Sequence, residues 1–363
     1  MKKKDIFVVI AASFLIFGLA LTGLLIPDKQ VSVSERRPLA EFPVLSFGGV
    51  ANGSFQEGFE AYSPDHFPFR DGFRTIKALT AYKLFRQKDN NGIYLADGHL
   101  SKLDYPESLD SVKKATDRFR DIIGWYADEN AKIYFSVIPD KNYFLARQNG
   151  YLSMDYDRLT AFAKNEMNVA EYIDITGLLE LSDYYRTDSH WRQECITEVA
   201  GLLADKMGTV LDETYTKTKL SGSFHGVYAG QSALPVAADE LLCLETQATE
   251  NCLVYDAETE SNIPVYNKEK LAGNDLYEVY LSGAKSLLKI ENPKGASDKK
   301  LIIFRDSFAS SLAPLLISGY REITLVDIRY ISPKILERFI DFSGRDMLFL
   351  YSTGVLSNSV TIK

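Results

Sequence analysis

The first hydrophobic feature of the chain is a run of 21 uncharged residues, Ile6–Ile26, that follows lysines at positions 2–4. About 20 apolar residues cross the hydrocarbon core of a bilayer as a helix, and flanking lysines stay on the cytoplasmic side. A cleaved signal peptide is the alternative, but residues 19–23 form only a weak cleavage site. We therefore predict a cytoplasmic tail over residues 1–5, a single-pass signal anchor over residues 6–26 and an extracytoplasmic remainder.

The segment of residues 27–106 is predicted to be a stalk and an N-terminal segment. It opens with a charged, proline-containing passage that is typical of extended chain. Apolar residues from Phe55 to Phe85 then recur at helical spacing, with interruptions at two prolines. Residues Ile93–Leu100 predict a short hairpin around Asp97-Gly98, because that pair tolerates the positive backbone angles of a tight turn.

From residue 107 onwards, buried strands alternate with amphipathic helices. The predicted strands are Lys132–Ile138, Tyr172–Ile175, Leu301–Phe304, Ile323–Ile328 and Met347–Tyr351. The predicted helices are residues 112–126, Trp191–Met207, Ala309–Ile317 and Pro333–Phe342. Such alternation implies right-handed crossovers and a parallel sheet that is covered on both faces. We therefore predict one α/β domain over residues 107–363.

An irregular insertion, residues 209–298, interrupts this domain and is rich in Gly, Ser and Thr. Short strand-like pieces are predicted at Leu253–Tyr255 and Tyr277–Tyr280. Cys243 and Cys252 flank a polar stretch that predicts a hairpin turn. The pattern is consistent both with a disulfide between them and with two unpaired thiols. Cys195 falls in a predicted helix, where we expect a small buried side chain.

Composition narrows the choice of partners. The formal net charge is −8, and removal of the four charged residues at positions 2–5 leaves −10. A domain this acidic is repelled by phosphate backbones, so nucleic acid is not an expected partner. The chain has four histidines and no Cys-x-x-Cys pair. We expect neither a structural metal nor a cofactor.

Ser307 is the first candidate for chemistry, because it follows the predicted strand Leu301–Phe304 and precedes a helix. Functional groups collect at the carboxyl ends of parallel strands, and the backbone N–H groups at the start of a helix can stabilise an oxyanion. A serine in this position suits an acyl-transfer nucleophile. The alternative is structural, because Asp306 and Ser307 are both favoured helix caps.

Asp188 and His190 are the complementary candidates. A serine hydroxyl needs a base to remove its proton, and a carboxylate holds a histidine base in the required tautomer. The sequence Asp188-Ser189-His190 can supply both groups from one turn. Here too the alternative is a cap, provided by Thr187 or Asp188, at the start of the following helix.

The segment from Tyr184 to Trp191, whose letters are YYRTDSHW, resembles the signature of the DHHW family of bacterial envelope proteins. That family is similar to the SGNH-hydrolase-like alginate O-acetylation proteins of the AlgJ/AlgX type. The resemblance covers roughly residues 35–355, including Asp306-Ser307-Phe308. It implies a three-layer SGNH-like sandwich with permuted motif order, in which Ser307 is the nucleophile, His190 the base and Asp188 its orienting partner.

Two positions depart from the family pattern. Ser189 stands where the family name expects a histidine, and Ala284 stands where relatives often have an asparagine that helps to bind the oxyanion. Loss of one such donor costs about 10²–10³ in rate. The expected oxyanion donors are therefore the backbone N–H groups of Ser307 and Gly283.

The function implied by the resemblance is extracytoplasmic O-acetylation of a cell-surface or exported polysaccharide. A multi-pass membrane acyltransferase of the MBOAT type would then be the partner that supplies acetyl groups. Two alternatives stay open. One is a carbohydrate acetylesterase with the same triad, and the other is a non-catalytic scaffold or polysaccharide-binding protein of the envelope, which Ala284 favours.

Overall fold

The computed structural model describes residues 3–212 and 214–363, and the chain divides into two compact units. One unit contains the chain up to Asn91 together with Ala229–Pro235, and the other contains Gly92–Tyr228 and Val236–Lys363. The division falls at Asn91 and not at residue 106. This is because the hairpin of β3 (Ile93–Ala96) and β4 (His99–Lys102) is bonded to the second unit, with the Leu100 N–H 2.7 Å from the Arg186 carbonyl oxygen.

The first unit begins with α1 (Lys3–Leu25), whose stretch Lys3–Gly23 has a mean hydropathy of 2.5 and is not buried. Within the described residues it is the one helix long and apolar enough to cross a membrane, so it fits a single-pass anchor. The remaining elements are β1 (Val31–Ser32), β2 (Arg37–Pro38), α2 (Phe47–Asn52), α3 (Ser54–Asp65), α4 (Arg70–Leu79) and a π-helical turn (Thr80–Leu84). The passage after α1 is not a free stalk, because Glu35 pairs with Arg70 at 2.5 Å and with Arg74 at 3.2 Å.

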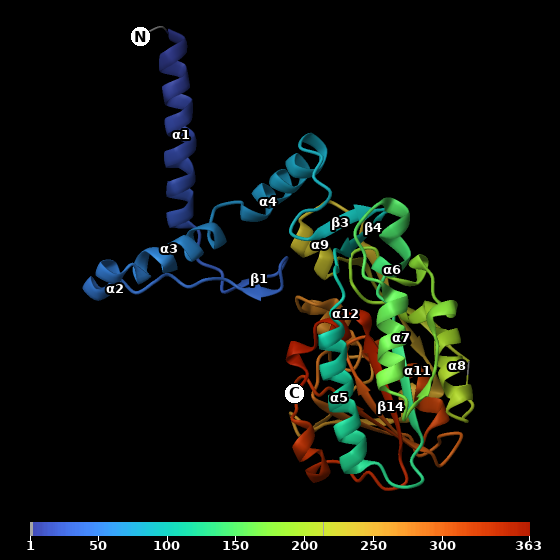
Figure 1. Ribbon diagram of the computed structural model, residues 1–363. Helices are drawn as coiled ribbons and strands as arrows, with labels where there is room; N and C mark the ends of the chain where they lie inside the picture. The colour runs from blue at the N-terminus through green and yellow to red at the C-terminus, as the bar shows by residue number, and fades with distance from the viewer. Residues whose placement is uncertain (1–2, 213) are drawn as a thin grey trace. The chain divides into compact units, whose positions relative to one another are not determined.

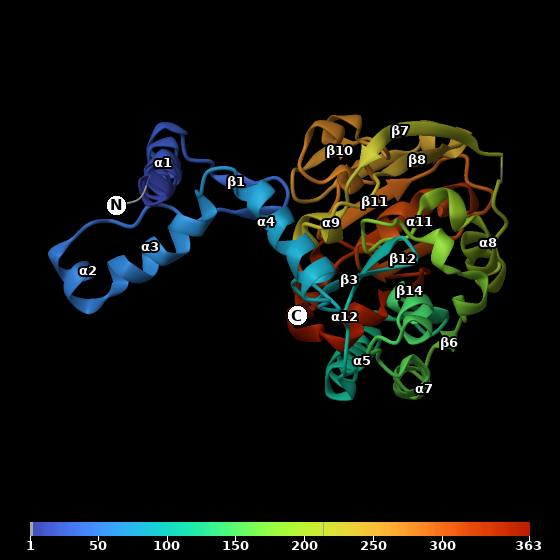
Figure 2. The same cartoon turned by 90° about the horizontal axis from the view of Figure 1, so that it is seen from above.

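The second unit is built on an eight-stranded sheet of order β10-β9-β11-β13-β12-β14-β5-β6 (Figures 1 and 2). Its members are β5 (Ile133–Ile138), β6 (Glu171–Tyr172), β9 (Leu253–Asp256), β10 (Ser261–Ile263), β11 (Leu287–Glu291), β12 (Lys300–Arg305), β13 (Glu322–Val326) and β14 (Asp346–Ser352). Strands β13, β12, β14, β5 and β6 are parallel, and β9, β10 and β11 form an antiparallel edge. The predicted α/β fold with a parallel sheet is therefore confirmed.

Helices cover both faces of the sheet. The helices of this unit are α5 (Leu109–Tyr126), α6 (Asn142–Leu145), α7 (Tyr156–Glu166), α8 (Thr197–Lys206), α9 (Val227–Ser232), α10 (Gln247–Asn251), α11 (Ala309–Leu316) and α12 (Thr353–Ser357). Helix α9 begins in this unit, and its residues from Ala229 onwards belong to the first unit. One core cluster joins the sheet to α8 and α11, and the other joins it to α5, α7 and α12. In β12, Leu301 and Ile303 face the first cluster, whereas Ile302 and Phe304 face the second. The result is the predicted three-layer sandwich.

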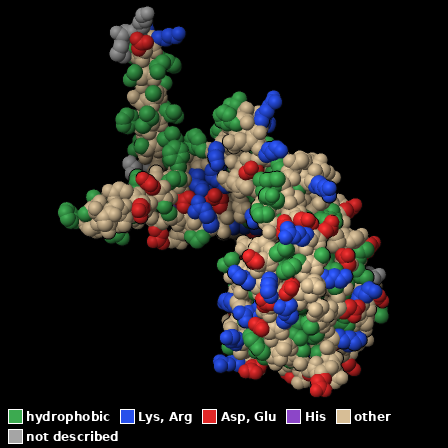
Figure 3. Space-filling model, in the orientation of Figure 1, with side chains coloured by type: hydrophobic (Ala, Val, Ile, Leu, Met, Phe, Trp, Pro, Cys, Tyr) green, Lys and Arg blue, Asp and Glu red, His purple; other side chains and the backbone are tan. Residues whose placement is uncertain are grey.

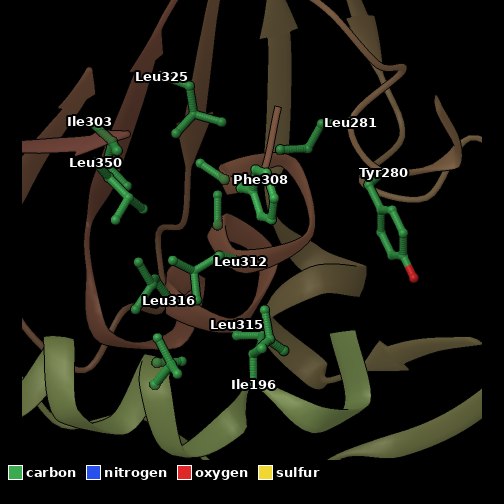
Figure 4. Close-up of a cluster of buried hydrophobic side chains, with 14 of the residues drawn as sticks. Ile196, Tyr280, Leu281, Ile303, Phe308, Leu312, Leu315, Leu316, Leu325 and Leu350 are labelled. Atoms are coloured by element: carbon green, nitrogen blue, oxygen red, sulfur yellow. The ribbon is translucent and has the colours of Figure 1, made fainter. Parts of the chain in front are cut away.

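Helix α11 lies deepest, because every one of its eight residues is buried. Leu312, Leu315 and Leu316 pack with Ile196 and Leu325 in the first cluster (Figure 4). Its two serines, Ser310 and Ser311, are buried with hydrogen-bond partners, at 2.7 Å from Arg305 and 2.8 Å from Tyr277. The burial of α11 fixes the position of the turn that precedes it, which contains Ser307.

Three predicted elements differ from the structure. The helix predicted from Trp191 begins only at Thr197, after a 3₁₀ turn (Gln193–Cys195), because the indole of Trp191 is buried against α11. Cys195 is half-buried in that 3₁₀ turn, not in a helix. The segments Leu276–Val279 and Pro333–Arg338 are likewise 3₁₀ turns, not the predicted strand and helix.

The predicted hairpin between Cys243 and Cys252 is also wrong. Strand β8 (Asp239–Glu245) pairs with β7 (Thr216–Phe224), and α10 separates β8 from β9. All three cysteines are free thiols in the structure.

The burial of α11 leads to a stability prediction. We expect Leu312→Ala to lower the free energy of unfolding by about 2–5 kcal/mol, because it removes a fully buried side chain from a closely packed core. Urea-induced unfolding measures the change. Leu253→Ala is the matched control, since Leu253 is 54% exposed, and it should shift the midpoint little. Equal losses in the two variants would contradict the described core.

Candidate active site

Ser307 lies after the carboxyl end of β12, which pairs with the parallel strands β13 and β14 on its two sides. It is the one residue of the stretch 301–310 that is not buried. Asp306 holds the turn before α11, because its Oδ1 accepts the Phe308 N–H at 3.0 Å and its Oδ2 accepts the Ser352 N–H at the end of β14 at 2.8 Å. The N-cap of α11 is Phe308, so neither Asp306 nor Ser307 caps the helix, and the Ser307 hydroxyl is left facing the site.

His190 connects Ser307 with Asp188. Its Nε2 lies 2.8 Å from the Ser307 Oγ, and its Nδ1 lies 2.6 Å from the Asp188 Oδ1. The second oxygen of the fully buried Asp188 accepts the Val227 N–H at 2.8 Å. The structure therefore brings all three predicted triad residues into one hydrogen-bonded row, in the order carboxylate, imidazole, hydroxyl. This order lets a proton pass from the hydroxyl to an imidazole whose other nitrogen is held by a carboxylate.

The turn that carries Asp188 and His190, here called the 185–190 turn, is held on its carbonyl side by Lys141. The Lys141 Nζ donates to the carbonyl oxygens of Tyr185 at 2.8 Å, Arg186 at 3.3 Å and Asp188 at 2.6 Å. Lys141 is 1% exposed, and this burial lowers the pKa of its ammonium to about 7.

Asp239 holds the same turn on its N–H side. Its carboxylate accepts the N–H groups of Arg186 and Thr187, both at 2.9 Å, and the Thr187 hydroxyl at 2.6 Å. Gly226 closes the other side of the turn, because a Cβ at this position would lie 2.2 Å from the Cβ of Asp188. The position of the Asp188 carboxylate thus depends on contacts from three separate segments of the chain.

Aromatic side chains orient the imidazole. The Tyr277 ring stacks on His190, with the ring centroids 3.9 Å apart and the planes 10° apart. The Tyr277 hydroxyl bonds to the Ser311 Oγ at 2.8 Å. Trp191 donates its indole N–H to the Phe308 carbonyl oxygen at 3.1 Å and so joins the 185–190 turn to the turn that holds Ser307.

Of the two predicted oxyanion donors, Ser307 and Gly283, one has a backbone N–H without another partner among the described residues and the other does not. The Ser307 N–H makes no hydrogen bond to another described residue. The Gly283 N–H, in contrast, donates to the Tyr280 carbonyl oxygen at 3.1 Å, because Leu281, Ser282 and Gly283 all have positive φ and turn the chain back on itself. Gly283 is therefore not a ready donor.

Sequence reasoning did not identify the roles of Lys141, Asp239, Gly226 and Tyr277. A lysine that directly follows a buried strand at its carboxyl end is a signal for Lys141. No pattern marks the other three, which lie within residues 209–298. The irregular insertion predicted there is wrong, because this range forms strands β7–β11, and β9, β10 and β11 belong to the central sheet. Among the described residues, no group of three His, Cys, Asp or Glu side chains is placed to hold a metal ion.

Comparison with known proteins supports the fold. No family model matches the sequence, and no curated protein sequence matches it. Matching solved structures include a DHHW family protein from Eubacterium siraeum, 20% identical with a TM-score of 0.55, over 76% of this chain and 95% of that one. They also include Bacillus cereus PatB1 with a sulfonyl adduct, 16% identical with a TM-score of 0.58, over 73% of this chain and 95% of that one. At these identities the likeness shows the fold alone, and the fold is the one that the DHHW resemblance implied.

The buried ammonium of Lys141 leads to a pH prediction. Its pKa is about 7 in the folded chain and has the ordinary value of 10.5 once the chain unfolds. Between these pH values the unfolded chain binds more protons, so stability rises with pH across this window. We expect the free energy of unfolding to rise more steeply with pH in the parent than in Lys141→Met.

Urea-induced unfolding at a series of pH values from about 7 to about 10 measures both slopes. Lys217→Met, which removes an exposed lysine on β7, should keep the parent's slope. A slope in Lys141→Met equal to the parent's would refute the lowered pKa.

Proposed function

We propose that this protein is an extracytoplasmic O-acetyltransferase that acts on a polysaccharide through an acyl-enzyme on Ser307. The observation that supports this most directly is the row of hydrogen bonds from Asp188 through His190 to the Ser307 Oγ, at 2.6 and 2.8 Å. Neither helix capping nor core packing requires that one imidazole bond to a carboxylate through one nitrogen and to a serine hydroxyl through the other. In this proposal Ser307 is the nucleophile, His190 the general base and Asp188 the group that orients the imidazole and stabilises its charged form.

The first half of the reaction forms the acyl-enzyme. The Ser307 Oγ attacks the carbonyl carbon of an acetyl ester, and its proton moves to the His190 Nε2. The oxyanion faces the Ser307 N–H, and the positive end of the α11 helix lies on the same side. The C–O bond of the donor then breaks, and the leaving alcohol takes the proton from His190.

The second half transfers the acetyl group. A sugar hydroxyl gives its proton to the His190 Nε2 and attacks the acetyl carbon, and the Ser307 Oγ leaves and recovers the proton. Water in place of the sugar gives acetate, which is the esterase alternative. His190 has 13% of its side chain exposed, so water can approach the site of the free protein.

The acceptor and donor classes are inferred from the sequence resemblance and from α1. The sequence resemblance to alginate-type O-acetylation proteins, together with the shared fold, favours a polysaccharide acceptor. The apolar helix α1 supports a membrane-anchored protein with its catalytic unit outside the cytoplasm. In that arrangement a multi-pass membrane acyltransferase of the MBOAT type would deliver acetyl groups across the membrane.

The first functional prediction concerns the acyl-enzyme. With 4-nitrophenyl acetate, the purified full-length chain should release nitrophenol and gain one acetyl group on Ser307, detected by peptide mass spectrometry. Ser307→Ala should abolish the label. Asp188→Asn should lower turnover by about 10²–10⁴-fold, because the imidazole loses its required tautomer. Ser261→Ala, on the edge strand β10, is the serine control and should behave as the parent.

Acceptor oligosaccharides then separate the two enzyme functions. If the protein is a transferase, an acceptor should speed nitrophenol release. The acceptor itself should gain about 42 mass units, the mass of one acetyl group less a hydrogen, as ester formation requires. Release of acetate alone supports the esterase. A folded protein with no turnover and no label on Ser307 would exclude both and favour the scaffold.

The stacking of Tyr277 on His190 generates a second functional prediction. Tyr277→Leu should lower the rate of Ser307 acetylation by about 2–10-fold, because an aromatic pair contributes about 0.5–1.5 kcal/mol beyond its buried area. Tyr277→Phe keeps the ring and loses only the bond to Ser311, so it should retain most of the rate. Equal losses in the two variants would mean that the hydroxyl, and not the stacking, orients the imidazole.

A further inference from the structure

Helix α4 carries an apolar face that is open to solvent. Phe69, Phe73 and Ile76 follow one another at steps of four and three residues, so they lie on one side of the helix. They are 68%, 43% and 60% exposed. Leu84 and Phe85, in the turn after the helix, are 71% and 68% exposed. Contiguous exposure of large apolar side chains is unusual on a soluble surface and marks an interaction site.

The opposite side of α4 is the one that packs within its own unit. Ala78 is fully buried there. Arg74 donates to the Gly230 carbonyl oxygen at 2.7 Å and pairs with Glu35 at 3.2 Å. On the apolar face the Phe73 ring makes an edge contact with the Phe67 ring, with the centroids 5.4 Å apart, but Phe69, Phe73 and Ile76 all stay exposed. The apolar face is therefore left for another partner.

The charge around this face is positive. Residues 66–91 contain six Lys and Arg but only two Asp and Glu, a net charge of +4 in a chain whose net charge is −8. Lys77 follows Ile76 in α4, Lys83 lies in the π-helical turn after the helix, and both lysines are exposed. An apolar face flanked by lysines is the pattern of helices that lie in the interface of an anionic bilayer.

The apolar face also starts close to the end of α1. The Pro68 ring lies against Gly23 of α1, so that a Cβ there would be 3.4 Å from the Pro68 Cγ. His66 pairs with Asp28, just after α1, at 3.2 Å. Phe69 therefore lies near the place where α1 would leave the bilayer, and exposed hydrophobic side chains occur on both α1 and the α4 segment (Figure 3).

We propose that the Phe69–Phe73–Ile76 face of α4 lies on the outer surface of the membrane that α1 crosses, with Lys77 and Lys83 at anionic lipid headgroups. This second contact restrains the first unit at the bilayer in addition to α1. It rests on α1 being retained as an anchor and does not depend on the ester chemistry. The rival occupant is an apolar surface of a multi-pass membrane protein.

The test uses the full-length chain reconstituted in vesicles of phosphatidylethanolamine and phosphatidylglycerol, with its mass checked to verify that α1 is present. Phe73→Trp and Ile76→Trp place a reporter on the apolar face at two positions. We expect lipids brominated near the headgroup to quench the added emission by about twofold or more, because such faces insert about 5–10 Å. Trp125 and Trp191 emit in every variant, and the parent chain supplies that background.

Thr75→Trp is the matched control, because it lies on the opposite side of the same helix and should stay unquenched. Replacing phosphatidylglycerol with a neutral lipid should weaken the quenching at both reporter positions, since the lysines then lose their partners. Quenching that is absent from Phe73→Trp and from Ile76→Trp would overturn the proposal and leave the face to a protein partner. Equal quenching of Thr75→Trp would overturn it as well.

Discussion

The candidate site depends on the buried charges that hold the 185–190 turn. This turn belongs to no helix and to no strand of the central sheet, so its backbone groups need partners from elsewhere. Lys141 serves three of its carbonyl oxygens and Asp239 serves two of its N–H groups. Burial of an ion costs several kcal/mol, and hydrogen bonds to a charged group each return about 1.5–3 kcal/mol. The fold therefore buries two ionisable groups whose main effect is to set one turn.

The second half of the site depends on the sheet. Ser307 is placed by β12, by the fully buried helix α11 and by the Asp306 carboxylate, which binds the end of β14. Trp191 joins the two halves through the Phe308 carbonyl oxygen. His190 and Ser307 are 117 residues apart in the chain, yet this contact sets them at hydrogen-bond distance. A rigid scaffold on both sides is what pre-organised catalysis requires.

The sequence predicted the parts of the molecule in which one local rule decides the structure. The strand Leu301–Phe304 is apolar at every position, and both of its faces are indeed covered. The Asp97-Gly98 hairpin follows from turn chemistry, and both residues have positive φ. Prediction failed where tertiary contacts decide. Trp191 has helical neighbours in the sequence, but it is buried against α11 and the helix begins only at Thr197. Tyr277 was predicted to lie in a strand, but it lies in a 3₁₀ turn and stacks its ring on His190. Contacts of this kind join distant segments and leave no periodic signal.

The proposed mechanism needs hydrogen-bond donors for the oxyanion, and few of the expected donors are available. The Gly283 N–H is bonded to Tyr280, and position 284 is alanine, so the Ser307 N–H is the one donor of the predicted set that makes no other bond among the described residues. A single backbone donor in water stabilises an oxyanion weakly, whereas the same donor in a site closed to water acts much more strongly. For the transfer half of the proposed reaction, the acceptor chain must therefore exclude water from Ser307 as it binds. Exclusion of water also suppresses hydrolysis of the acyl-enzyme, so the same event that strengthens catalysis favours transfer over esterase activity.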